Sequence, residues 1–223
     1  MRIQTTKFSF TDSSTVFVEA TIPVTILLLT RGGMGAGYGQ SFTLAEIKQV
    51  RVREFHRSVQ ALGVRYRIFD FPDLLLEQQI AQAVQRVLPI VRREQFSALF
   101  SFHPQSHTLE HSDHRAVGKI ALRLWEVSDV RHFVERYPAT GIRPALYLLV
   151  QDIPPIVTPT HIIEYGGHIQ GKRNQHIRIY PSQFLRSTDG FSHWVELFDR
   201  VASRVAVWHG RTLPYAEAYR LIE

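Results

Sequence analysis

The chain alternates short apolar runs with longer amphipathic stretches, and this alternation restricts its fold more than any other feature. The clearest run, Val24–Thr30, is apolar almost throughout, and further strands are predicted at 65–71, 97–102 and 145–150. Strands with apolar side chains on both faces are typical of parallel sheets, because the connecting helices cover both faces. The alternation therefore predicts an α/β fold with a mostly parallel sheet.

Helical periodicity follows the predicted strands. The first amphipathic stretch opens at Thr43, which forms a capping-box pattern with Glu46. It ends at Gly63, a residue type common just beyond helix C-termini. Further helices are predicted at 74–93, 113–127, 172–179 and 194–202, with a short element from Pro214.

The N-terminal residues fit this pattern poorly. They are polar and alternate only weakly, at Phe8 and Phe10 and again at Val16 and Val18. Such alternation is compatible with a β-hairpin or with a loosely ordered segment. We therefore expect an atypical N-terminal segment over residues 1–20, followed by a single α/β domain over 21–223.

Composition narrows the setting and the partners. The chain has 223 residues and no cysteine, which excludes disulfides and thiolate zinc sites and suits a reducing, cytoplasmic setting. Its formal charge of +6 is scattered, without the basic runs typical of nucleic-acid binding. The apolar stretch 22–30 is interrupted by Pro23 and is too short to span a bilayer. We expect a small-molecule ligand and neither a nucleic-acid nor a membrane partner, and leave homo-oligomerisation open.

A glycine-rich segment, Gly32 to Gly39, directly follows the first predicted strand. Dinucleotide-binding turns space their glycines as G-x-G-x-x-G and open directly into a helix. Here the spacing differs, and the next helix begins only near Thr43. The segment therefore favours a substrate-facing loop, with a nucleotide site as the weaker alternative.

Histidines are concentrated between residues 103 and 114, after the predicted strand 97–102. They are His103, His107, His111 and His114, and Asp113 lies among them. Imidazole is the commonest metal ligand, and the carboxyl ends of parallel strands are where α/β proteins bind ligands. The alternative is structural: Asp113 caps a helix and the histidines are exposed.

Several ordered motifs together resemble one family. They are Leu29-Thr30-Arg-Gly32-Gly-Met-Gly35, Arg51-x-x-Glu54, Phe69-Asp70-Phe-Pro-Asp73, His111-x-Asp113-His114-Arg-Ala-Val117-Gly118, Tyr180-Pro-Ser182-Gln183 and Tyr215-Ala-Glu217-Ala-Tyr219. This set is similar to the LmbE-like, or PIG-L, family of zinc-dependent de-N-acetylases, which act on N-acetylglucosamine conjugates. The resemblance extends over about residues 24–223.

The resemblance implies a Rossmann-like three-layer α/β sandwich that holds one Zn²⁺ at its strand ends. His114 would be a metal ligand, and His111 would polarise or protonate the tetrahedral intermediate. Asp113 would orient a neighbouring imidazole. Arg51 would reach the substrate, a small amino-sugar conjugate, and the glycine-rich segment would shape the sugar pocket.

One family motif is not found in the sequence. The family's first strand ends in His-Pro-Asp-Asp, which supplies the general base and two of three protein ligands. Here the single His-Pro, His103-Pro104, is followed by Gln105. The first strand is therefore expected to be missing or replaced, or the chain is a degenerate member; His103 or His107 could complete the metal site instead.

Two functional hypotheses follow. The first is a metal-dependent de-N-acetylase-like hydrolase of an N-acetylated amino-sugar conjugate, in an active or an inactive form. The second is a non-catalytic carbohydrate-binding or structural relative, because a catalytic zinc site uses about three protein ligands and the motifs supply one.

Overall fold

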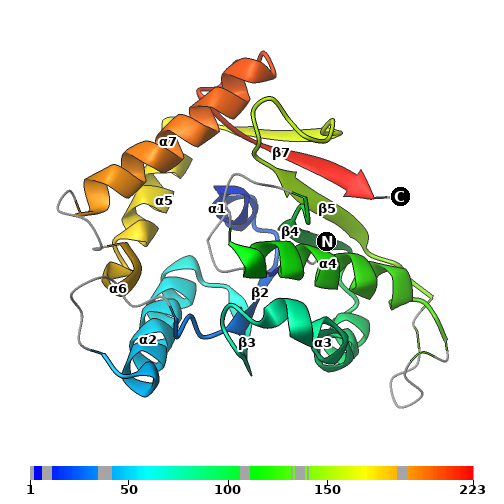
Figure 1. Cartoon of the computed structure of the whole chain (residues 1–223). Coiled ribbons are helices and arrows are strands. Elements are labelled where there is room, and N and C mark those ends of the chain that lie inside the picture. The colour runs from blue at the N-terminus through cyan, green and yellow to red at the C-terminus, as the bar shows by residue number, and fades with distance from the viewer. Residues whose placement is uncertain are drawn as a thin grey trace.

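The computed structural model describes residues 3–6, 12–34, 42–105, 111–131, 133, 139, 141–184 and 190–222. One seven-stranded sheet runs through the molecule in the order β3-β2-β1-β4-β5-β7-β6 (Figure 1). Its strands are β1 (Ile3–Thr6), β2 (Val24–Thr30), β3 (Arg65–Phe71), β4 (Ala98–Phe102), β5 (Ala145–Val150), β6 (His161–Tyr165) and β7 (Tyr215–Ile222).

The sheet is mixed. β3, β2, β1, β4 and β5 are mutually parallel, which confirms the α/β prediction for the strands expected from apolar runs. β7 pairs antiparallel with both β5 and β6. The sequence pattern missed β6, whose side chains are mostly half-buried, and showed β7 only as a short element.

The N-terminal segment supplies a central strand. Ile3 pairs in register with Val24 of β2 and with Ala98 of β4, so β1 lies between these two strands. Residues Asp12–Glu19 then form helix α1, so the hairpin alternative is wrong at Val16 and Val18. α1 is fixed by Phe17, whose buried ring lies 4.9 Å from that of Phe100. The first strand, which was expected to be missing or replaced, is formed here by Ile3–Thr6.

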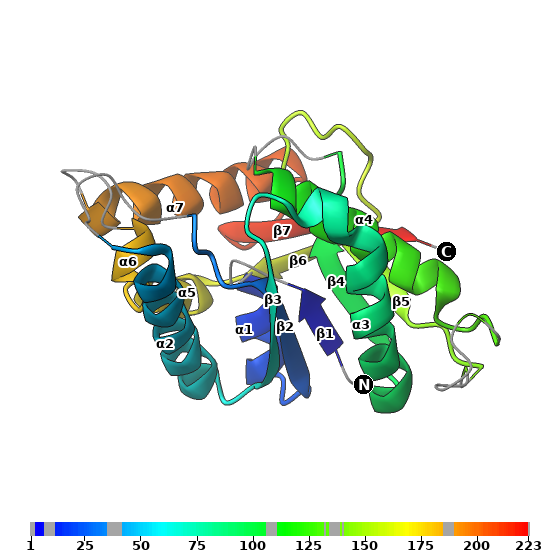
Figure 2. The ribbon, with the colours of Figure 1, turned by 60° about the horizontal axis from the view of Figure 1, so that its bottom comes forward.

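Helices cover both faces of the sheet. Figure 2 shows α3 and α4 on one side and α1 and α2 on the other. The remaining helices are α2 (Leu44–Leu62), a 3₁₀ turn (Leu76–Gln79), α3 (Ile80–Glu94), α4 (Ser112–Val127), α5 (Gly167–Ile177), α6 (Pro181–Phe184) and α7 (Gly190–Trp208). None of the described helices is both long and apolar enough to cross a membrane.

The best-predicted helix is α2. Its capping box between Thr43 and Glu46 forms as expected, and Gly63 adopts the left-handed conformation, φ +66°, that ends the helix. The helix predicted over 74–93 is instead a 3₁₀ turn followed directly by α3, and the backbone N–H groups of Leu74 and Leu76 donate to Asp113, outside the segment.

The core is built where strands and helices meet. All seven residues of β2 are buried, as its continuous apolar run requires. Phe100 of β4 stacks on Tyr147 at 4.7 Å and meets Tyr219 edge-on at 5.3 Å. Aromatic contacts therefore join α1, β4, β5 and β7, which are far apart in sequence.

Gly118 allows α4 to lie against the end of β4. A Cβ at this position would lie 2.5 Å from the Phe102 carbonyl oxygen and 2.9 Å from the Pro104 nitrogen, both backbone atoms. Neither can move without shifting the strand end, so glycine is required by close approach.

Gly118→Ala should therefore lower the free energy of unfolding by about 1–3 kcal/mol, the range of an overpacked site. The matched control is Gly171→Ala in α5, where a Cβ meets nothing within 4 Å. The control should raise stability by about 0.5–1 kcal/mol, because alanine favours the helix. Urea unfolding of both variants measures the difference, and equal effects would contradict the packing argument.

Candidate functional site

Polar and ionisable side chains gather at the carboxyl edge of the parallel strands. Thr30 is the last residue of β2, and Asp73 lies two residues beyond β3. His103 directly follows β4, and His111 to His114 open helix α4. This edge is the usual ligand-binding position of an open α/β sheet.

His111 is the N-cap of α4. Its backbone is extended, and its Nδ1 accepts a hydrogen bond from the Asp113 backbone N–H at 3.3 Å. In the neutral ring an accepting Nδ1 places the proton on Nε2. The expectation that Asp113 caps the helix is therefore wrong, because the cap is the histidine two residues earlier.

Asp113 is 0% exposed. Its Oδ2 accepts from the Leu74 N–H at 2.8 Å and its Oδ1 from the Leu76 N–H at 3.2 Å. Burial raises the pKa of this carboxyl, and the two backbone hydrogen bonds and nearby His111 act in the opposite direction. Its described hydrogen bonds thus tie α4 to the chain after β3, and its role in orienting an imidazole stays a prediction.

His114 lies beside His111. The two rings are 5.0 Å apart between centroids, and His114 stacks on Phe102 at 4.3 Å with an interplanar angle of 16°. The backbone N–H of His114 donates to the His111 carbonyl at 3.0 Å. The structure therefore brings the two predicted histidines together at the start of α4, over the end of β4.

The described residues do not supply a zinc site. Among them, no group of three His, Cys, Asp or Glu side chains could hold a metal ion. Both oxygens of Asp113 and the Nδ1 of His111 accept backbone hydrogen bonds. Residues 7–11, which follow β1, read Lys-Phe-Ser-Phe-Thr and contain no usual zinc ligand. Since a catalytic zinc uses about three protein ligands, this donor set does not fit the metal.

The two other histidines of the cluster differ. His107 lies outside the described residues. His103 is 7% exposed, and its Nδ1 accepts from the Gln105 N–H at 3.3 Å. Burial lowers the pKa of His103, a nearby Asp152 opposes that shift and Arg220 adds to it. His103 is therefore held as a neutral ring at the end of β4.

A buried neutral histidine makes stability depend on pH. Because the pKa of His103 is lower in the folded than in the unfolded chain, the unfolded chain binds more protons as pH falls below about 6.5. Stability should therefore decrease between pH 7 and pH 5, and the decrease should be smaller in His103→Gln. Urea unfolding across this range measures it, and identical pH slopes in both proteins would contradict the assignment.

Arg51 lies in a buried polar network between α2 and α6. Its Nη1 donates to Gln183 Oε1 at 2.8 Å and its Nη2 to the Ser182 carbonyl at 3.2 Å. Glu54, one turn along α2, accepts from the Ser182 backbone N–H at 2.9 Å and from its hydroxyl at 2.5 Å. Two motifs 131 residues apart thus meet. Contact between Arg51 and a substrate stays a prediction.

Loss of this network should be costly. Arg51→Ala leaves Gln183 and the Ser182 carbonyl without their charged donor, so we expect stability to fall by about 2–3 kcal/mol. Arg57→Ala on the exposed face of the same helix is the control and should have little effect. Denaturant midpoints measure both, and a similarly small loss in Arg51→Ala would show that the network contributes little.

Asp73 is a residue to which sequence reasoning assigned no role. Its Oδ1 accepts from the Thr30 hydroxyl at 3.0 Å and its Oδ2 from the Met34 backbone N–H at 2.9 Å. The available signal was the Pro72-Asp73 pair at a strand exit, a pattern common in turns. The partners could not be foreseen, since they lie about forty residues earlier in the chain.

The nucleotide alternative gains no support from α2, the helix that follows the glycine-rich segment. α2 begins at Leu44, well after the end of β2, and Glu46 accepts from the Thr43 N–H at 2.8 Å. A carboxylate of the chain therefore already lies at this helix N-terminus, where a phosphate would bind. Glycines 35, 37 and 39 lie outside the described residues.

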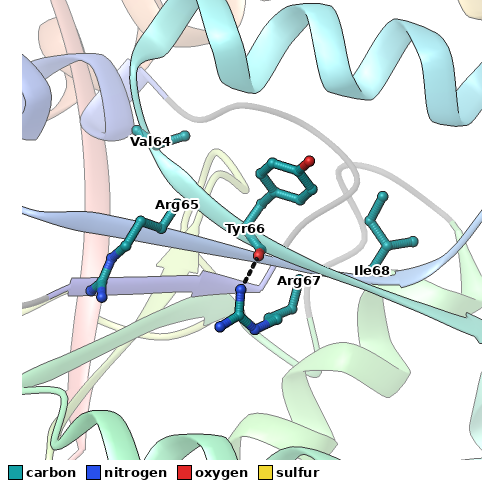
Figure 3. Close-up of a pocket in the computed structure, with 5 residues that line it drawn as sticks. All are labelled: Val64, Arg65, Tyr66, Arg67 and Ile68. Atoms are coloured by element: carbon teal, nitrogen blue, oxygen red, sulfur yellow. Dashed lines mark hydrogen bonds between the residues drawn. The ribbon is translucent and has the colours of Figure 1, made fainter.

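A hollow of about 560 Å³ lies along the edge strand β3, lined by residues 64–68 (Figure 3). Arg67 donates to the Tyr66 carbonyl at 3.0 Å, and Arg65 pairs with Glu94 at 3.1 Å. Charged side chains over an edge strand discourage pairing with another chain. The hollow contains none of the predicted site residues.

Comparisons with known proteins find a matching family and similar folds. Residues 7–125, just over half of the chain, match the model of a family described as PIG-L, GlcNAc-PI de-N-acetylase. No curated protein sequence matches the chain.

Three solved structures are similar over nearly the whole chain. The N,N'-diacetylchitobiose deacetylase of Pyrococcus horikoshii has a TM-score of 0.84 and 19% identity, covering 99% of this chain and 83% of that one. The 4-carboxy-2-hydroxymuconate hydratase GalB of Pseudomonas putida KT2440 gives 0.76 and 16%, covering 100% and 96%. A teicoplanin deacetylase, Orf2, in its zinc-inhibited form gives 0.70 and 12%, covering 100% and 98%. At these identities the likeness shows the fold.

Proposed function

Because the chain belongs to the PIG-L family of metal-dependent deacetylases, we propose that it binds an N-acetylated amino-sugar conjugate at the carboxyl edge of its sheet without hydrolysing it. The proposal includes the Rossmann-like three-layer sandwich that the family resemblance implies. The observation that carries it is the state of the His-x-Asp-His element. The element is folded and packed, yet no group of three His, Cys, Asp or Glu side chains among the described residues could hold a metal ion.

Recognition would centre on His111. With Nδ1 accepting from Asp113, the proton on Nε2 can be donated to the carbonyl oxygen of an acetamide. Exposed apolar side chains, Met34, Leu74 and Leu75, belong to the chain segments that end β2 and β3 at this edge. A few placed polar groups beside apolar side chains are typical of small-molecule sites.

The test is a calorimetric titration with the methyl glycoside of N-acetylglucosamine, compared with the glycoside of glucosamine. We expect the acetylated glycoside to bind and the free amine to bind more weakly, because it lacks the acetamide carbonyl. His111→Ala should weaken binding about tenfold. His168→Ala is the control, since that side chain is 67% exposed on α5. An equal affinity for the two glycosides, or none for either, would overturn the proposal.

A second candidate is the hydrolase. It is favoured by the 5.0 Å separation of the His111 and His114 rings, which suits the proton-donating role that the family resemblance implies for His111. It would need metal ligands from outside the described residues, with His107 the first to examine. Acetate release from the acetylated glycoside with added Zn²⁺, lost in both His114→Ala and His107→Ala, would replace the binding proposal by this one.

A further inference from the structure

The turn between β3 and the 3₁₀ helix is held by the hydrogen bonds of two carboxylates, those of Asp113 and Asp73. On one side Asp113 accepts the backbone N–H groups of Leu74 and Leu76. On the other side Asp73, which belongs to the turn itself, accepts the Thr30 hydroxyl and the Met34 N–H. The turn is therefore the shared element between the start of α4 and the chain leaving β2.

The turn has an unusual backbone. Leu74 has φ +66°, a left-handed conformation that is rare for a bulky residue. Its side chain is 45% exposed, so burial of the leucine does little to offset the strain. The hydrogen bond from its N–H to Asp113 holds this conformation. Strained residues of this kind persist where the surroundings determine the backbone, and they cluster at functional sites.

The chain leaving β2 is held in the same way. The Thr30 side chain is fully buried, and Met34 is tied through its backbone rather than its exposed side chain. Gly33 lies between them against α2, where a Cβ would come within 2.8 Å of Leu44 Cδ1. Residues 31–34, where the glycine-rich segment begins, thus have their position set from both the turn after β3 and α2.

We propose that Asp73 is a positioning residue, which sets the entrance of the glycine-rich segment relative to His111 and His114 through the turn 72–76. The connection runs from His111 to Asp113, from Asp113 to the backbone of the turn, and from Asp73 in that turn to Met34. Its effect on a ligand rests on the proposed function, but its effect on residues 31–34 does not.

Asp73→Asn tests the proposal, because the amide keeps one acceptor oxygen and loses the other. The Met34 amide should exchange with solvent about three- to tenfold faster, the effect expected for one hydrogen bond. The His111 ring resonances should also shift in the NMR spectrum, although the substituted residue is not in contact with that ring in the described hydrogen bonds. Affinity for methyl N-acetylglucosaminide should fall by a similar factor.

The matched control is Asp70→Asn. Asp70 contacts the same segment only through the side chain of Arg31, at 3.5 Å; it also pairs with Lys48 of α2 at 3.3 Å and is solvent-exposed. It should leave the Met34 exchange rate and the His111 resonances unchanged. Asp73→Glu, which retains both acceptor oxygens, should recover more of the wild-type exchange rate than Asp73→Asn.

The outcomes separate this inference from the proposed function. If the wild type binds no acetylated glycoside, the proposed function fails, while exchange and ring resonances still test Asp73. If exchange at Met34 changes no more in Asp73→Asn than in Asp70→Asn, or if the His111 resonances stay in place, the positioning role is overturned. A loss of affinity with both unchanged would instead mean that Asp73 contacts the ligand directly.

Discussion

A carboxylate with no exposed surface is unfavourable unless hydrogen-bond donors replace its water, and at Asp113 two backbone N–H groups do so. Because these donors belong to the turn after β3, the requirement joins two parts of the chain about forty residues apart. The first turn of α4 and the end of β3 must then form together. The arrangement of the whole carboxyl edge, including both histidines of the His-x-Asp-His element, depends on this contact.

A second network, between α2 and α6, also pairs buried charged groups with hydrogen-bond partners from a distant part of the chain. Arg51 and Glu54 on α2 bind residues 182 and 183, and both Nη atoms of Arg51 and both carboxylate oxygens of Glu54 have partners there. In both places a motif recognised for its family resemblance is engaged in holding the fold. Motif residues can therefore be retained for architecture, and their presence alone does not establish catalysis.

Local signals were enough to predict the elements that local interactions stabilise. The buried run of β2, the capping box of Thr43 and Glu46, and the left-handed Gly63 all follow from short-range rules. β1 was not predicted because its four residues, Ile3–Thr6, are mostly polar and form a strand only by pairing with β2 and β4. The partners of Asp113 and Asp73 were likewise hidden, because a sequence shows which residues can accept hydrogen bonds but not which distant backbone amides will reach them.

The hydrogen bonds of Asp113 affect the chemistry that is available at the carboxyl edge of the sheet. Each oxygen of Asp113 accepts one of the two described backbone hydrogen bonds and could bind an ion only through the lone pair that this bond leaves. Turning this carboxylate away from the turn would break the hydrogen bond that holds the left-handed conformation of Leu74. Any role that reorients Asp113 therefore lowers the stability of the turn, whereas acetamide recognition through the Nε2 proton of His111 needs no bond of the described structure to break.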